Sequence, residues 1–168
     1  MTGAINEEIS VTLLTEADWQ LWRSLRLLAL AEAPYAFGST LEQWSGTHDQ
    51  EPRWRDRLRN AGVALVCFLG RQPAGMVATT TPTDSETELV SMWVVPELRG
   101  RGVGDRLISE VLIWANELNL AQVRLYVREM NLSAIALYER HGFVDTGERC
   151  DEMDGMCEMS MVRILDKL

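Results

Sequence analysis

Residues 86–104 read ETELVSMWVVPELRGRGVG, and this stretch decides how the rest of the chain is interpreted. Its first half, residues 88–95, is rich in Val, Met and Trp, which favours a buried β-strand. Pro96 ends that strand because proline cannot donate to a sheet ladder. Arginines and glycines fill residues 99–104, and a helical pattern follows at once. A strand, a glycine-rich turn and a helix N-terminus together predict a phosphate cradle, since backbone N–H groups and the helix dipole favour negative charge.

Two well-known phosphate loops do not fit this stretch. A Walker loop needs a lysine after its glycines, but the only lysine in the chain is Lys167. The dinucleotide fingerprint needs a third glycine, and Asp105 or Leu107 stands where that glycine would fall. The spacing that remains is R-x-x-G-x-G at residues 99–104.

This spacing resembles the Q/R-x-x-G-x-G/A loop of the GNAT acetyltransferases. The resemblance continues in VREMNLSAIALYERHGF, residues 127–143, which carries Asn131, Tyr138 and Gly142-Phe143 at matching places. It covers roughly residues 63–165. It implies the GNAT fold, an α/β fold with a central, mostly antiparallel mixed sheet and helices on both faces. We expect one GNAT acetyltransferase domain over residues 1–168.

The composition limits the classes of partner. The chain has 168 residues, 46% of them hydrophobic, which is enough for one domain with a full core. Its net charge of −9 argues against non-specific binding to nucleic acid or to an anionic membrane. No apolar run is long enough to span a membrane and the N-terminus is no signal peptide, so we predict a cytoplasmic protein. Three cysteines without C-x-x-C spacing and two histidines predict neither a disulfide framework nor a metal site.

Apolar patterns along the chain predict the element order β-α-α-β-β-β-α-β-α-β-β. After a first strand over residues 9–14, a capping-box variant at Thr15 begins a helix that Pro34 ends. The expected apolar stripe of that helix is Leu14, Trp19, Trp22, Leu25, Leu28 and Ala29. The later elements are a helix over 51–60, strands at 63–69, 75–80 and 88–95, a helix after 104, a strand at 121–127, a helix ending near 141 and a hairpin of 143–146 with 156–164.

Two segments before residue 61 have alternative interpretations. The helix over 51–60 carries Arg53, Arg55, Arg57 and Arg59. These side chains point around the helix, so we interpret them as a solvated face and not as a binding patch. The aromatic residues Tyr35, Phe37 and Trp44 form either a cap over the core or, as the resemblance implies, a wall of the acceptor site, and we weigh the two equally.

The resemblance implies that acetyl-CoA is the cosubstrate and that no metal takes part. The residues implied to bind acetyl-CoA are Trp93, Val94, Val95, Arg99, Gly100, Arg101, Gly102, Val103, Gly104, Asn131 and Ser133. The 99–104 loop would hold the pyrophosphate, and the bulged strand from Met92 to Val95 would pair with pantetheine. A backbone N–H near Trp93 or Val94 would polarise the thioester carbonyl. Asp105 adds a carboxylate beside the phosphates, a departure that Arg101 or Arg106 would have to offset.

Two side chains are candidates for proton transfer. Glu88 lies eleven positions before Arg99, where histone-acetylating members of the family carry their general base. Apolar surroundings would raise its pKa towards neutral, although a solvent-facing carboxylate, with water as the base, is the alternative and Glu86 a second candidate. Tyr138 matches the tyrosine that members of the family aim at the sulfur as general acid, and a core tyrosine is its alternative.

We therefore predict an acetyl-CoA-dependent N-acetyltransferase acting on a primary amine of a small molecule, by direct attack in a ternary complex. A protein N-terminus or lysine is the alternative acceptor, and a non-catalytic acyl-CoA-binding module is the alternative of another class. The acidic residues Glu148, Asp151, Glu152 and Asp154 indicate a cationic acceptor, or only a soluble turn. Many members of the family dimerise, so a homodimer is left open.

Overall fold

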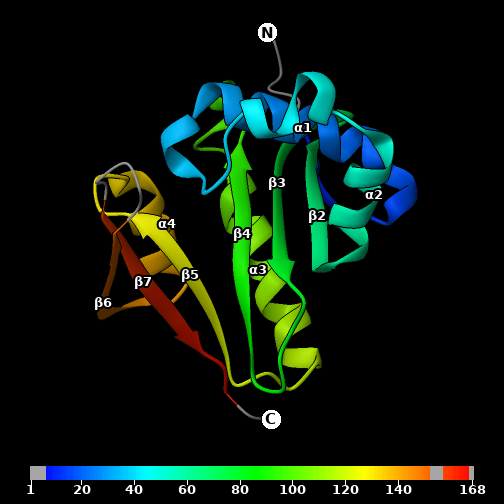
Figure 1. Ribbon diagram of the computed structural model, residues 1–168. Coiled ribbons are helices and arrows are strands. Elements are labelled where there is room, and N and C mark those ends of the chain that lie inside the picture. The colour runs from blue at the N-terminus through cyan, green and yellow to red at the C-terminus, as the bar shows by residue number, and fades with distance from the viewer. Residues whose placement is uncertain (1–6, 152–156, 167–168) are drawn as a thin grey trace, which may run out of the picture.

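A computed structural model describes residues 7–151 and 157–166. Within these residues a seven-stranded sheet has the order β1-β2-β3-β4-β5-β7-β6 (Figure 1). The strands are β1 Ile9–Leu13, β2 Ala61–Leu69, β3 Gln72–Thr80, β4 Glu86–Val94, β5 Gln122–Arg128, β6 Val144–Asp151 and β7 Cys157–Ile164. All neighbouring strands pair antiparallel except β4 and β5. The predicted element order and mixed sheet are confirmed.

Helices cover both faces of the sheet. On one face lie α1 Trp19–Glu32 and α2 Glu51–Arg59, and on the other lie α3 Val103–Glu117 and α4 Leu132–Arg140 (Figure 1). Each layer buries its own apolar cluster against the sheet, so the sheet separates two cores. No helix in the described ranges is long and apolar enough to cross a membrane.

The start of α1 follows the predicted capping box, but its buried face differs from the predicted stripe. Thr15 accepts a hydrogen bond from the Ala17 N–H and its own N–H donates to Asp18. Leu28 was expected in the core but is 57% exposed, because it lies about 120° around the helix from Trp22. Arg26 is buried on the core side instead.

Strand β4 carries the irregularity that opens the sheet. Two steps along β3 match three steps along β4 between Val90 and Trp93, so β4 bulges there, and Ser91 takes the left-handed φ of 58°. On its other edge β4 pairs with β5 only over residues 86–88. Beyond that point the two strands diverge (Figure 1). The β5-facing backbone groups of residues 89–94 therefore have no partner in the sheet.

Candidate active site

The diverging strands open one cleft, which we call the first cleft, of about 440 Å³. Met92, Trp93 and Val94 of β4 line one side, and Tyr126 and Val127 of β5 line the other. The 99–104 loop closes one end, and α4 contributes further side chains. The first cleft thus joins the bulged strand to the glycine-rich loop, as the sequence predicts for a phosphate-bearing linear ligand.

The loop has the backbone of an anion cradle. Gly100 and Gly102 have φ of 75° and 83°, a region that side chains with a Cβ rarely adopt. Gly102 is the N-cap residue of α3, a helix of 15 residues. The first N–H groups of that helix have no carbonyl partner within it, and the helix dipole adds positive potential there. A diphosphate therefore fits this end of the first cleft.

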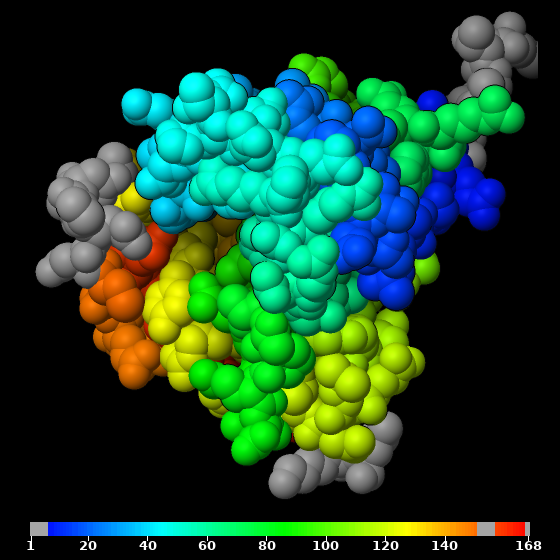
Figure 2. Space-filling view, turned by 45° about the vertical axis from the view of Figure 1, so that its right-hand side comes forward, coloured from blue at the N-terminus to red at the C-terminus, as the bar shows by residue number. Residues whose placement is uncertain are grey.

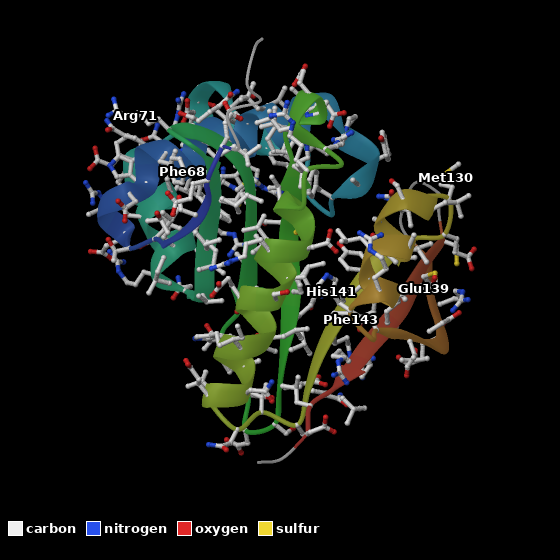
Figure 3. The ribbon with its side chains drawn as sticks, turned by 180° about the vertical axis from the view of Figure 1, so that it is seen from behind. Phe68, Arg71, Met130, Glu139, His141 and Phe143 are labelled. Atoms are coloured by element: carbon white, nitrogen blue, oxygen red, sulfur yellow. The ribbon has the colours of Figure 1, made fainter. Side chains whose placement is uncertain are left out.

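The carboxylate of Asp105, which the sequence places beside the phosphates, is neutralised from α4. Arg140 Nη2 lies 3.1 Å from Asp105 Oδ1, and His141 Nε2 lies 2.9 Å from the same oxygen. Figure 3 shows His141 between α3 and α4. Burial favours a higher pKa for Asp105, but the hydrogen bonds with His141 and Arg140 outweigh it and hold that pKa below its ordinary value.

The expectation that Arg101 or Arg106 offsets Asp105 is wrong. Arg101 Nη1 lies 3.2 Å from Glu7 Oε2, and Arg106 Nη2 lies 2.7 Å from Glu110 Oε1. Each arginine is thus paired with another carboxylate, and Asp105 is paired with Arg140 and His141 instead.

Most of the predicted acetyl-CoA residues come together at the first cleft. Those that line it are Trp93, Val94, Arg99, Gly100, Gly102, Val103, Gly104, Asn131 and Ser133. Val95 and Arg101 do not line it. The Val95 N–H donates to the Ala74 carbonyl at 2.8 Å, which fixes it on the β3 side, and Arg101 is turned towards Glu7.

A second cleft, of about 470 Å³, opens on the α1 and α2 side of β4. Figure 2 shows the surface hollowed between the cyan segment before α2, green β4 and yellow β5. The residues that line both clefts are Ala36, Phe37, Met92, Tyr126 and Tyr138. The two clefts therefore meet beside these side chains.

The aromatic segment before α2 contributes side chains to both clefts. Phe37 and Trp44 line the second cleft, and Tyr35 lines the first. Phe37 is also buried in the apolar cluster on the α1 side, as the alternative of a cap over the core predicts. Trp44 packs on Trp54 of α2, with ring centroids 4.6 Å apart.

Glu88 lines the second cleft and is half-buried. Burial raises its pKa above the ordinary value, with Arg124 lowering it and Glu86 raising it to smaller extents. Glu86, the second candidate, lines neither cleft and forms a hydrogen bond with Gln122 and an ion pair with Arg124. The environment favours Glu88 over Glu86 as a proton acceptor.

Tyr138 lies where the clefts meet and is buried. Its ring packs edge-on against Phe143, with centroids 5.9 Å apart, and burial raises the pKa of its phenol. Within the described part of the chain its hydroxyl makes no hydrogen bond. The phenol is therefore protonated at neutral pH and available to a ligand.

The arginines of α2 divide into two kinds, which the sequence did not reveal. Arg55 pairs with Glu51 at 2.7 Å on the solvent side, as predicted. The interpretation as a solvated face is wrong for Arg57, which is half-buried and lines the second cleft. Arg26 of α1 lines the same cleft and was not among the candidates. Among the described residues, no group of three His, Cys, Asp or Glu side chains is placed to hold a metal ion.

A diphosphate cradle, a strand with an open backbone edge and a second cleft that meets the first define the site of an acyltransferase. The model of the Acetyltransferase (GNAT) family matches residues 22–143, and the chain belongs to this family. The predicted enzyme class is thereby confirmed. No curated protein sequence matches the chain.

Solved structures share the whole fold at low identity. An acetyltransferase of the GNAT family from Streptococcus pneumoniae is 20% identical over 95% of this chain and 100% of its own, with a TM-score of 0.75. The spermidine N-acetyltransferase from Vibrio cholerae, in complex with CoA and spermine, is 18% identical over 95% and 96%, with a TM-score of 0.73. The ribosomal-protein-S18-alanine N-acetyltransferase from Escherichia coli is 20% identical over 95% of both chains, with a TM-score of 0.71. These likenesses confirm the predicted fold.

Proposed function

We propose that this protein transfers the acetyl group of acetyl-CoA to a primary amine of a small molecule, by direct attack in a ternary complex. One observation carries the proposal: the two clefts share Met92, Tyr126 and Tyr138. A thioester held in the first cleft and an amine held in the second would meet there. The Vibrio cholerae structure, in complex with CoA and spermine, supports the choice of donor.

The first cleft suits acetyl-CoA at both of its ends. The 99–104 loop and the α3 N-terminus would bind the pyrophosphate, and the open edge of residues 89–94 would pair with the amides of pantetheine. Because the Val95 N–H points to β3, the Val94 N–H points the opposite way, towards the first cleft. That N–H would polarise the thioester carbonyl.

Two side chains would move the protons. Glu88 would accept a proton from the ammonium group of the acceptor, directly or through water, so that the nitrogen can attack. As the N–C bond forms and the C–S bond breaks, Tyr138 would give its phenolic proton to the leaving sulfur, and the second proton lost by the nitrogen would return to the phenolate through water. The raised pKa of Glu88 suits a base and the raised pKa of Tyr138 keeps its proton available. Acetyl-CoA, when bound, supplies the activated acetyl group.

The second cleft supports a small acceptor. Its volume lies within the range of about 300–1,000 Å³ typical of small-molecule sites, and residues 36–44 cover it. A protein N-terminus or lysine stays the alternative, since the Escherichia coli relative is a ribosomal-protein-S18-alanine N-acetyltransferase. The cytoplasmic location and the homodimer left open stay predictions from the sequence.

Thiol release from acetyl-CoA, measured with amines, amino acids, aminoglycosides and peptides, tests the proposal. We expect turnover with at least one small amine to exceed turnover with peptides. Preferred turnover of peptides would make the protein acceptor correct. Binding of acetyl-CoA with no thiol release for any acceptor would leave a non-catalytic module.

A further inference from the structure

Arg26 is a buried cation that forms no ion pair with any residue that the structure describes. It lies one helical turn after Trp22 on the buried face of α1 and is only 7% exposed. Its Nη1 is fully buried and makes no hydrogen bond with any described residue. The guanidinium stacks over the ring of Phe37 at 4.5 Å and lines the second cleft. Burying a guanidinium nitrogen without a hydrogen-bond acceptor destabilises the folded protein unless a ligand supplies that acceptor.

Arg57 adds a second positive charge to the same wall. It reaches from α2 to β4, where its Nη2 lies 3.4 Å from Ser91 Oγ. Among the described residues neither Arg57 nor Arg26 forms an ion pair, whereas Arg55 and Arg59 on the same helix each pair with a glutamate. Burial and the charge of Arg57 together lower the pKa of Arg26 to about 10. Both side chains still carry charge at neutral pH.

The carboxylates that line the second cleft form no ion pair with Arg26 or Arg57 among the described residues. Glu158 lies 3.7 Å from the Nε of the buried Arg128. Glu88 stands in register with Arg124 across the β4–β5 ladder, and the charge of Arg124 acts on it. The α1 and α2 wall of the cleft is therefore positive, and the opposite wall holds the proton acceptor.

We propose that the acceptor carries an oxyanion, a carboxylate or a phosphate, in addition to its amine, and that Arg26 and Arg57 bind this group. The inference rests on the proposed function and names its substrate class. Guanidinium groups bind carboxylate and phosphate through paired, charge-assisted hydrogen bonds. An oxyanion between the two arginines would satisfy the buried Nη1 and offset two like charges.

The position of Ser91 sets the size of this acceptor. Arg57 meets β4 at Ser91, three residues after Glu88, which corresponds to at most about 10 Å of strand. An amine near Glu88 and an oxyanion near Ser91 would therefore lie no more than about 10 Å apart, which limits the acceptor to a small molecule such as an amino acid or a small aminoalkyl phosphate.

An acceptor with an oxyanion carries a second charge opposite in sign to that of the cationic acceptor that the acidic residues between the last two strands suggest. The structure places Glu148 in β6 and not in a turn, and its carboxylate lies 3.2 Å from Arg124. Glu152 and Asp154 lie outside the described residues. The reacting amine is still a cation before it loses its proton, but the second charge of the acceptor is negative. Spermine, which the Vibrio cholerae protein binds in its solved complex, lacks that second charge.

Matched acceptors test the proposal in a thiol-release assay with acetyl-CoA. Methionine is compared with 3-(methylthio)propylamine, which lacks only the carboxylate, and O-phosphoethanolamine with ethanolamine, which lacks only the phosphate. Spermidine represents the polyamines. We expect kcat/KM to be about tenfold or more higher for the oxyanion-bearing member of at least one pair. The pair that shows the preference distinguishes carboxylate from phosphate.

Variants assign that preference to the two arginines. Arg26→Gln and Arg57→Gln should each lower the kcat/KM ratio of the preferred pair about tenfold. Arg55→Gln, on the solvent side of α2, is the matched control and should leave the ratio unchanged. Arg57 is half-buried, so its variant tests the proposal even if Arg26→Gln does not fold, and a thermal shift with acetyl-CoA shows which variants are folded.

The possible outcomes distinguish failure of the oxyanion site from failure of the proposed acetyltransferase function. Turnover of spermidine or of the oxyanion-free amines with no preference within either pair overturns the oxyanion site and leaves the acetyltransferase function standing. A preference that survives both substitutions also overturns it. Absence of thiol release with every acceptor, while acetyl-CoA still gives a thermal shift, overturns the proposed function itself.

Discussion

The guanidinium of Arg99 lies 3.0 Å from the carboxylate of Glu32, and this ion pair ties the loop after β4 to the last turn of α1. The same oxygen of Glu32 accepts a hydrogen bond of 2.9 Å from the Trp93 indole. Arg99 also donates to the Val94 carbonyl at 3.1 Å. The bond from Trp93 is the main cause that holds the pKa of Glu32 below its ordinary value. These contacts fix the start of the loop against the end of α1.

We expect Glu32→Gln to weaken the binding of acetyl-CoA. The change removes the charge that holds Arg99 and one of two strong bonds at the start of the loop. A charge-assisted bond of this kind contributes about 1 kcal/mol, which is about fivefold in Kd. Calorimetric titration with acetyl-CoA measures it, and Glu51→Gln, which breaks the exposed pair with Arg55, is the control. Equal Kd values for Glu32→Gln and the control would show that the ion pair between Glu32 and Arg99 does not contribute to acetyl-CoA binding.

Gly102→Val should abolish the thermal stabilisation by acetyl-CoA. Gly102 has a φ of 83°, which a β-branched residue adopts only with strain, and its backbone would approach the phosphates closely. Gly147→Val is a matched control, because Gly147 has a φ of 85° and open space around it in β6, away from the first cleft. The control should lose stability but keep its thermal shift. A normal shift for Gly102→Val would mean that the loop does not bind acetyl-CoA.

Tyr138→Phe should lower kcat more than it weakens acetyl-CoA binding. The phenol acts on charge that develops on the sulfur only during the reaction, so its loss could reduce kcat by about 10²-fold. The substitution keeps the ring that packs against Phe143, so the fold should be preserved. Steady-state kinetics with the best acceptor measure both parameters. An unchanged kcat would make Tyr138 a packing residue.

The pH dependence of kcat/KM should reflect the ionisation of Glu88. A base acts when it is deprotonated, so kcat/KM should fall as the pH drops through the pKa of Glu88. Because burial raises that pKa, the fall should lie above the range of an ordinary glutamate. Glu88→Gln should remove this limb and lower kcat by about 10²–10⁴-fold.

Glu86→Gln serves as the control for the pH profile. It should keep the acidic limb but move it to slightly lower pH, because the charge of Glu86 raises the pKa of Glu88. If Glu88→Gln retains the limb, the proton leaves through water or through another group.

The sequence predicted those parts of the fold and site that depend on local patterns. The period-2 and period-3.6 repeats located β2, β3 and α3, and the glycine spacing located the loop. Arg26 was missed because a charged residue is excluded from an apolar stripe, although its spacing from Trp22 and Ala29 placed it on the buried face. The pairing of Asp105 with His141 had no signal, since it joins residues 36 positions apart across two helices. The bulge at Ser91 depends on register with β3, which composition does not set.

Because β4 pairs with β5 only over residues 86–88, the rest of β4 has one unpaired edge although the strand lies in the middle of the sheet. Exposed edges usually invite pairing with another chain and have to be protected. Here residues 35–37 and α4 flank the edge, so residues 89–94 lie inside a cleft and not on an open rim. The break in the sheet thus offers an unpaired backbone edge to a ligand, and the segments that flank this edge stand where another chain would have to pair.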